Sequence, residues 1–144
     1  MVNLLIGPKG TGKTQNLIDL ANQEAKSRDG DIVFIKKTHK ETSSLSFKVR
    51  AVCMDDYPGI KNTDTYIGFL YGMYSNDTDI ESIFIDNITK IADITLDNLD
   101  IFLDKLVKVG RDINVNFTVT ISADEGAYSY DGEGAQTVKY EIRC

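Results

Sequence analysis

The sequence has few of the cysteines that form the disulfide cross-links of small extracellular domains. It contains only two cysteines, Cys53 and Cys144, and neither has a partner at the spacing of a zinc site or a redox pair. A chain of 144 residues needs no such cross-link, because a domain of this length buries about 68 to 70% of its unfolded surface. We therefore expect one domain, spanning residues 1–144, in a reducing compartment.

Long apolar runs are also missing. No stretch approaches the roughly 18 residues of a membrane span, and the apolar opening has no charged flank and is too short for a signal peptide. Sixteen basic against twenty-two acidic residues give a net charge of −6, which repels nucleic-acid phosphates and anionic lipid headgroups. These features predict a cytoplasmic protein with no membrane partner, for which nucleic acid is a poor ligand.

The chain instead shows a regular alternation of short apolar runs and segments with helical periodicity. The predicted strands are 2–6, 31–35, 47–54, 82–86, 115–122 and 137–142, and the predicted helices are 13–29, 64–74 and 96–110. Glycines at 30 and 110 are expected to end the first and third helices. This order predicts an α/β fold with a mostly parallel sheet of about five or six strands and helices on both faces. Ligands of such sheets bind beyond the carboxyl ends of the strands.

A phosphate-binding motif lies between the first strand and the first helix. It fits the Walker A pattern at every position: Gly7, Pro8, Lys9, Gly10, Thr11, Gly12, Lys13 and Thr14. Its glycines let backbone N–H groups curl around phosphate oxygens, next to the positive end of the helix dipole. The Lys13 ammonium is placed to bridge β- and γ-phosphates, and the Thr14 hydroxyl is placed to ligate Mg²⁺.

On these residues the whole chain resembles the P-loop NTPase superfamily. Gly7 to Thr14 is similar to its Walker A motif, and the run from Ser82 to Asp86 is similar to its Walker B motif. More narrowly, these segments and the run from Thr120 to Asp124 resemble small bacterial ATP-binding proteins of one domain. Those proteins are labelled as of unknown function or, loosely, as twitching-motility ATPases. The resemblance implies ATP as ligand or substrate, with Mg²⁺ held by Thr14 and, through water, by Asp86.

The residues around the Walker B position leave some roles open. Asp86 could hold Mg²⁺ and act with Lys13 in catalysis, or it could cap the next helix together with Asn87. Many ATP hydrolases of this superfamily place a glutamate after the Walker B aspartate, so Asn87 predicts slow intrinsic hydrolysis. Thr120 and Ser122 end the following strand, where related ATPases often sense the γ-phosphate, although both residue types are also common on half-buried strands.

Two charged clusters lie outside the motifs. The sequence favours a solvated basic turn for Lys36, Lys37, His39 and Lys40, although these residues could also meet a phosphate or an acidic partner. Asp55 and Asp56 stand beside Pro58 and Gly59 and are typical of a turn, although either could serve as a base or an outer metal ligand.

Three functions fit this sequence. The first is an ATP-binding domain that hydrolyses ATP slowly or only with a partner, which could be another protein or a second copy that supplies an arginine. The second is a small nucleoside-type kinase, against which stand Asn87, the lack of a cysteine zinc lobe and the presence of only four arginines. The third is a noncatalytic module whose shape responds to the bound nucleotide. The base preference, phosphoryl acceptor and oligomeric state stay open.

Overall fold

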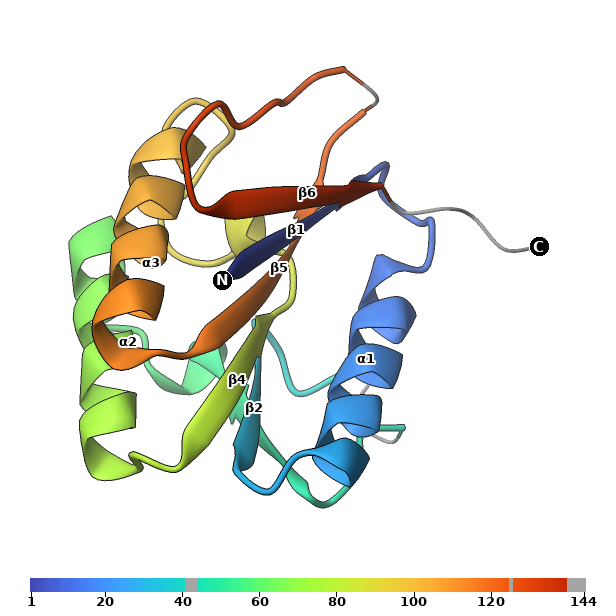
Figure 1. Cartoon of the computed structure of the whole chain (residues 1–144). Helices are drawn as coiled ribbons and strands as arrows, with labels where there is room; N and C mark the ends of the chain where they lie inside the picture. Colours follow the sequence, from blue (N-terminus) through green and yellow to red (C-terminus); the bar gives the residue numbers. More distant parts are fainter. Residues whose placement is uncertain (41–43, 125, 140–144) are drawn as a thin grey trace.

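The structure, a computed structural model, describes residues 1–40, 44–124 and 126–139. Six strands form one sheet in the order β3-β2-β4-β5-β1-β6, and every neighbouring pair is parallel (Figure 1). The strands are β1 (Val2–Gly7), β2 (Asp31–Lys36), β3 (Val49–Cys53), β4 (Ile80–Ile85), β5 (Asn116–Ser122) and β6 (Ala135–Lys139). The predicted parallel α/β sheet is confirmed. The last strand begins two residues earlier than predicted, and its predicted end at residue 142 lies outside the described residues.

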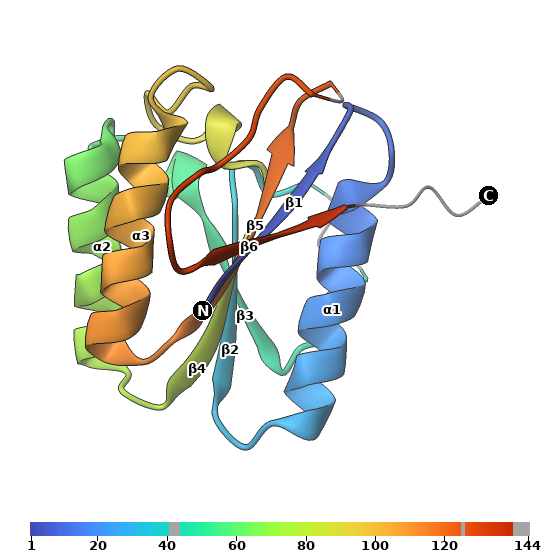
Figure 2. The ribbon, with the colours of Figure 1, turned by 45° about the horizontal axis from the view of Figure 1, so that its top comes forward.

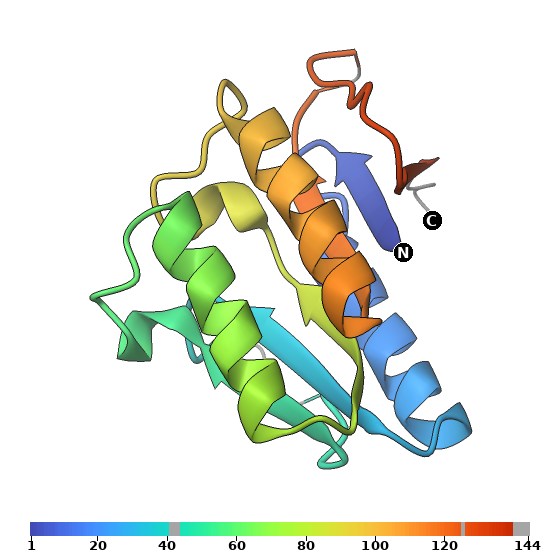
Figure 3. The ribbon, with the colours of Figure 1, turned by 60° about the vertical axis from the view of Figure 1, so that its left-hand side comes forward.

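Helices cover both faces of the sheet, as expected. Helix α1 (Lys13–Ser27) lies on one face, and α2 (Thr63–Asn76) and α3 (Leu99–Ile113) lie side by side on the other (Figures 2 and 3). Leu17, Ile18 and Ala21 of α1 pack against β2 and β4. A larger apolar cluster fills the space beneath α2 and α3. The buried strands β2 and β4 therefore have apolar side chains on both faces, as parallel sheets require.

The third helix differs from its expected limits. It starts at Leu99, so Leu96 lies before it, and it continues through Gly110 to Ile113. A Cβ at Gly110 would lie 3.3 Å from the carbonyl oxygen of Val115, so this glycine lets α3 approach β5 closely instead of ending the helix. Asn114, with φ of 54°, is the residue that ends it in the left-handed conformation.

The strand order brings the sequence motifs to one edge of the sheet. Strand β5 lies between β1 and β4, and Gly7 at the end of β1 is in register with Ser122 at the end of β5. Asp86 directly follows β4, which pairs with the other side of β5. The Walker A loop, Asp86 and the end of β5 therefore meet beyond the carboxyl ends of three adjacent strands.

The helices within the described ranges are too short or too polar to cross a membrane.

Candidate functional site

The Walker A loop wraps around the N-terminus of α1. Gly10 and Gly12 both have φ of 82°, in the left-handed region that favours glycine. The loop is closed by two bonds to the carbonyl oxygen of Pro8: Thr11 Oγ1 donates at 2.8 Å and Lys13 Nζ donates at 2.6 Å. These bonds hold the loop in a tight curl at the positive end of the helix dipole, which is a favourable position for an anion.

The carboxylate of Asp86 is connected to two elements. Thr14 Oγ1, in the first turn of α1, donates to it at 3.0 Å and 3.2 Å. Thr120 Oγ1, near the end of β5, donates to Asp86 Oδ1 at 3.0 Å. The structure thus brings together Thr14 and Asp86, the two side chains expected to hold Mg²⁺. The helix-cap interpretation of Asp86 is wrong, because the cap position of the following short helix η2 (Ile88–Lys90) is Asn87, which makes no side-chain capping bond.

Asn87 is fixed in one orientation. Its φ is 53°, and its backbone N–H donates to Thr120 Oγ1 at 2.6 Å. Its side-chain Nδ2 donates to Ser122 Oγ at 3.1 Å, and its Oδ1 accepts from Thr89 Oγ1 at 2.9 Å. Thr120 and Ser122 therefore support Asp86 and Asn87, and both also line the cavity described next.

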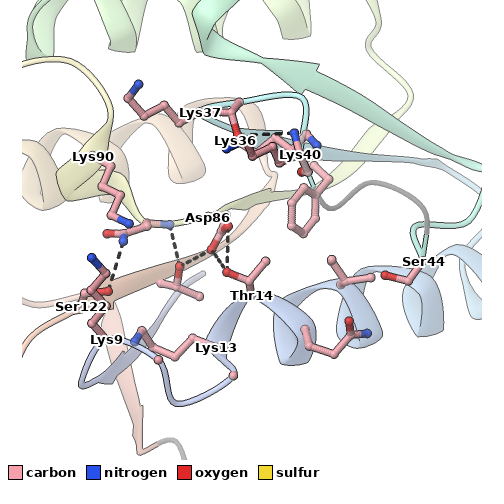
Figure 4. Close-up of a pocket in the computed structure, with 18 residues that line it drawn as sticks. Lys9, Lys13, Thr14, Lys36, Lys37, Lys40, Ser44, Asp86, Lys90 and Ser122 are labelled. Carbon is pink, nitrogen blue, oxygen red and sulfur yellow. Dashed lines mark hydrogen bonds between the residues drawn. The ribbon is translucent and has the colours of Figure 1, made fainter.

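A cavity of about 770 Å³ opens over these residues (Figure 4). Among the described residues, Asp86 is the only carboxylate that lines it, whereas six lysines do: Lys9, Lys13, Lys36, Lys37, Lys40 and Lys90. Lysines thus outnumber carboxylates among the described residues of its lining, in a chain whose net charge is −6. Low-dielectric walls with charge of one sign concentrate the field and attract anions.

The structure corrects the predicted solvated turn at one residue. Lys37, His39 and Lys40 are exposed in the turn after β2, as expected. Lys36 is instead the last residue of β2 and only 6% exposed, and with Lys37 and Lys40 it lines the cavity. Parallel strands explain the difference, because the turn after β2 lies at the same edge of the sheet as the Walker A loop. Sequence reasoning missed Lys90 altogether. Lys90 could have been found from its position, since it lies four residues after the Walker B aspartate and therefore near the same edge of the sheet.

Lys13 carries the clearest electrostatic perturbation of the site. Burial lowers the pKa of its ammonium, the Asp86 carboxylate opposes that effect, and repulsion from Lys90 adds to it. The charged form of Lys13 is therefore disfavoured where no anion is bound, and a bound anion would favour it.

Asp55 and Asp56 belong to a separate cluster. They lie in the short helix η1 (Met54–Asp56), where Asp55 pairs with Lys37 at 3.3 Å and Asp56 with His39 at 2.8 Å. The Cys53 thiol donates to the carbonyl oxygen of Lys37 at 3.1 Å, so this cluster positions the turn that follows β2. The atoms that Cys53, His39 and Asp56 could offer a metal lie within 4.8 Å of one another, a grouping that sequence spacing did not indicate. Neither aspartate lines the cavity.

The chain is similar to known proteins in its fold, not in its sequence. No family model matches the sequence, and no curated protein matches it. Among solved structures, the chain is similar to a KaiC-like protein from the hyperthermophilic archaeon Pyrococcus horikoshii OT3, with a TM-score of 0.68 and 19% identity over 96% of this chain and 70% of that one. This likeness confirms the P-loop NTPase fold expected from the sequence. It gives no support to the twitching-motility label.

The fold is too widely shared to define a function by itself. The chain matches 146 solved chains, and one fold commonly carries many activities. The functional argument therefore depends on the residues of the cavity.

Proposed function

We propose that the chain is a single nucleotide-binding domain, over residues 1–144, that binds ATP together with Mg²⁺ in the lysine-lined cavity. The observation that carries the proposal is the bond between Thr14 and Asp86, which are 72 positions apart in the sequence. A hydroxyl and a carboxylate fit Mg²⁺, which takes oxygen ligands and keeps several waters. Thr14 and Asp86 lie beside the glycine loop and the buried Lys13, in the position expected for ligands of the metal that accompanies a nucleoside triphosphate.

Each residue of the loop then has a role. The backbone N–H groups from Lys9 to Thr14 would hold the β-phosphate, and Gly10 and Gly12 permit the left-handed turns that aim them. Lys13, once released from the Pro8 carbonyl, would bridge β- and γ-phosphates. Mg²⁺, when bound, would neutralise part of the phosphate charge. Thr120 would keep the Asp86 carboxylate facing Thr14.

Hydrolysis by this domain alone should be slow. Asn87 stands where many relatives place a glutamate, and its amide can position a water but cannot accept a proton. Among the described residues that line the cavity, Asp86 is the only carboxylate that could act as a base, and we assign it to the metal. We therefore propose a cytoplasmic ATPase that is slow or depends on a partner, either another protein or a second copy of the chain.

Phosphoryl transfer to a small acceptor is the second candidate. The observation that favours it is the group of lysines across the cavity from the Walker A loop, which ATP hydrolysis does not require. A noncatalytic module gated by nucleotide has no comparable observation in its favour.

Nucleotide binding can be tested by calorimetry with Mg·ATP on the full chain. We expect one site per chain in the parent and loss of that site in Lys13→Ala. Binding with the same affinity in parent and variant would show that the loop is not the phosphate site. A steady-state phosphate-release assay on the same protein then separates a slow ATPase from a fast one.

A further inference from the structure

Three side chains of the kinds that bind metals meet beyond the carboxyl ends of β2 and β3. Lys36 and Cys53, the last residues of these two strands, are in register. The turn that follows β2 carries His39, and the short helix η1 that follows β3 ends at Asp56. The atoms that His39, Cys53 and Asp56 can offer a metal lie within 4.8 Å of one another. None of the three residues lines the cavity.

The local backbone explains why these side chains meet. Cys53 is the N-cap residue of η1 and Asp56 is its last residue. A 3₁₀-helix has three residues per turn, so side chains three positions apart lie on the same side of it. The pairing of β2 with β3 brings His39 to that side, where its Nε2 lies 2.8 Å from Asp56 Oδ1. The cluster therefore depends on strand pairing as well as on local spacing.

The Cys53 thiol is directed at this cluster and away from the apolar core. Cys53 is only 5% exposed, yet it belongs to neither apolar cluster that the described residues form, although Val52 and Met54 beside it belong to the larger one. Its Sγ donates to the carbonyl oxygen of Lys37 at 3.1 Å, and that oxygen also accepts the Asp55 N–H at 3.0 Å. Loss of the thiol proton would therefore leave no buried acceptor unpaired.

The separations in the cluster are close to those of a tetrahedral metal site. Zinc bonds to nitrogen, oxygen and sulfur are about 2.0 to 2.3 Å long, which places tetrahedral ligand atoms about 3.3 to 3.7 Å apart. No pair of the three atoms would have to close by more than roughly 1.5 Å to reach this range. The side chains of His39 and Asp56 are 71% and 51% exposed, so they can turn toward a metal while the buried Cys53 stays in place.

We propose that Cys53, His39 and Asp56 bind a transition-metal ion of the zinc type, with water as the fourth ligand. A thiolate and an imidazole favour Zn²⁺ and related ions over Mg²⁺, which prefers oxygen ligands. The site is therefore chemically distinct from the proposed magnesium site, and it does not depend on nucleotide binding. The thiol proton passes to solvent when the metal binds. The bound metal ties the turn after β2 to the start of η1.

The test is a cobalt titration of the full chain, kept reduced by a reductant without thiols and freed of metal with a chelator. Any affinity tag is removed first, because His39 is the only histidine in the sequence. Mg²⁺ is present in excess, so that sites made of oxygen ligands are filled. Co²⁺ bound by a thiolate gives a charge-transfer absorption in the near ultraviolet. We expect this absorption to saturate at one Co²⁺ per chain and to disappear when Zn²⁺ displaces the cobalt.

Substitutions assign the ligands. Cys53→Ser should abolish the charge-transfer absorption. His39→Gln and Asp56→Asn should keep it at saturation and weaken cobalt binding by at least about tenfold. Because His39 and Asp56 are exposed, these two variants test the site even if Cys53→Ser does not fold.

Two matched controls accompany these variants. Cys144→Ser removes the only other thiol in the sequence. Asp55→Asn removes the neighbouring carboxylate of η1, which pairs with Lys37 instead of His39. Both controls should bind cobalt with an affinity within about threefold of the parent.

Thermal denaturation gives a second readout, because a metal that binds the folded state raises its melting temperature. Zn²⁺ should raise the melting temperature of the parent and of Asp55→Asn, and by less than half as much in His39→Gln.

Three results would overturn the proposal. The first is a parent without the charge-transfer absorption at saturating Co²⁺. The second is an absorption that disappears in Cys144→Ser. The third is cobalt affinity, or stabilisation by Zn²⁺, that is the same in His39→Gln as in the parent. No step of the test uses a nucleotide, so its result does not depend on the proposed ATP site.

Discussion

Thr120 connects the backbone of Asn87 with the side chain of Asp86. Its hydroxyl accepts the Asn87 N–H at 2.6 Å and donates to Asp86 Oδ1 at 3.0 Å. Thr120 is fully buried, so neither bond can be replaced by solvent without a rearrangement. This single side chain from β5 therefore sets the positions of both residues that follow β4.

The first prediction concerns Thr120→Val, which keeps the shape of the side chain and removes its hydroxyl. It should lower the free energy of unfolding by about 1 to 3 kcal/mol, because the partly buried Asn87 N–H loses its acceptor. It should also weaken the Mg²⁺ dependence of nucleotide binding, since Asp86 loses one of its two orienting donors. Chemical denaturation and magnesium titrations measure the two effects.

Thr118→Val is the control for that substitution. Thr118 lies on the same face of β5, is also buried, and has no side-chain hydrogen bond within the described ranges. The control should cost less than Thr120→Val and leave magnesium dependence unchanged. Equal costs for the two substitutions would mean that the Thr120 hydroxyl does not organise the site.

The second prediction is that Mg·ATP raises the melting temperature. A ligand that binds only the folded state stabilises it by about 2.7 kcal/mol at a hundredfold excess over Kd. Lys13→Ala should lose most of this shift, whereas Lys26→Ala, an exposed lysine in the last turn of α1, should keep it. If Mg·ATP still raised the melting temperature of Lys13→Ala by the same amount, the phosphates would have to bind outside the Walker A loop.

Lys13→Ala should also be well tolerated in the protein without nucleotide. Burial lowers the pKa of Lys13, so the folded state disfavours its charge. Linkage gives the direction of the pH dependence. The charge of Lys13 destabilises the folded state at a pH below the pKa that Lys13 has in the folded protein, and this destabilisation is relieved as the pH rises through that pKa. We expect the variant to lose less than about 1 kcal/mol of unfolding free energy at neutral pH, as measured by urea denaturation. A larger loss would show that the bond from Lys13 Nζ to the Pro8 carbonyl outweighs the cost of burial.

The third prediction is slow turnover by the isolated chain. Enzymes have a median turnover of about 10 per second, and we expect less than about one per second here because Asn87 cannot accept a proton from the attacking water. A phosphate-release assay on the pure protein measures this. Faster turnover without a partner would direct the search for a base toward Asp55, Asp56 and Asp124, none of which lines the cavity.

The sequence predicted those parts of the site that depend on local pattern. The strands follow from apolar runs and the Walker A loop from glycine spacing, and both are properties of a few adjacent residues. Asp86 was also predictable, because it directly follows a buried strand. The predicted end of α3 failed at Gly110, since a glycine at a helix terminus and a glycine at a close helix-to-sheet contact look alike in sequence.

The lysine-lined wall could not be predicted in the same way. Whether Lys36 and Lys40 form a solvated turn or line a cavity depends on the position of β2 in the sheet, two strands away from β5. That position is set by long-range pairing. The contacts of Asn87 with Ser122 and of Cys53 with Lys37 likewise join segments whose proximity depends on strand order.

The central claim is that Thr14 and Asp86 together hold the metal of a bound nucleotide. The most direct measurement is ATP affinity as a function of Mg²⁺ concentration in the parent, Thr14→Val, Asp86→Ala and the double variant, with exposed Asp97→Ala as control. We predict that Mg²⁺ strengthens ATP binding by about tenfold or more in the parent and control. We expect it to do so by less than about threefold in either single variant, with no further loss in the double variant because the pair acts as a unit. The same magnesium dependence in the parent and in both single variants would contradict the account.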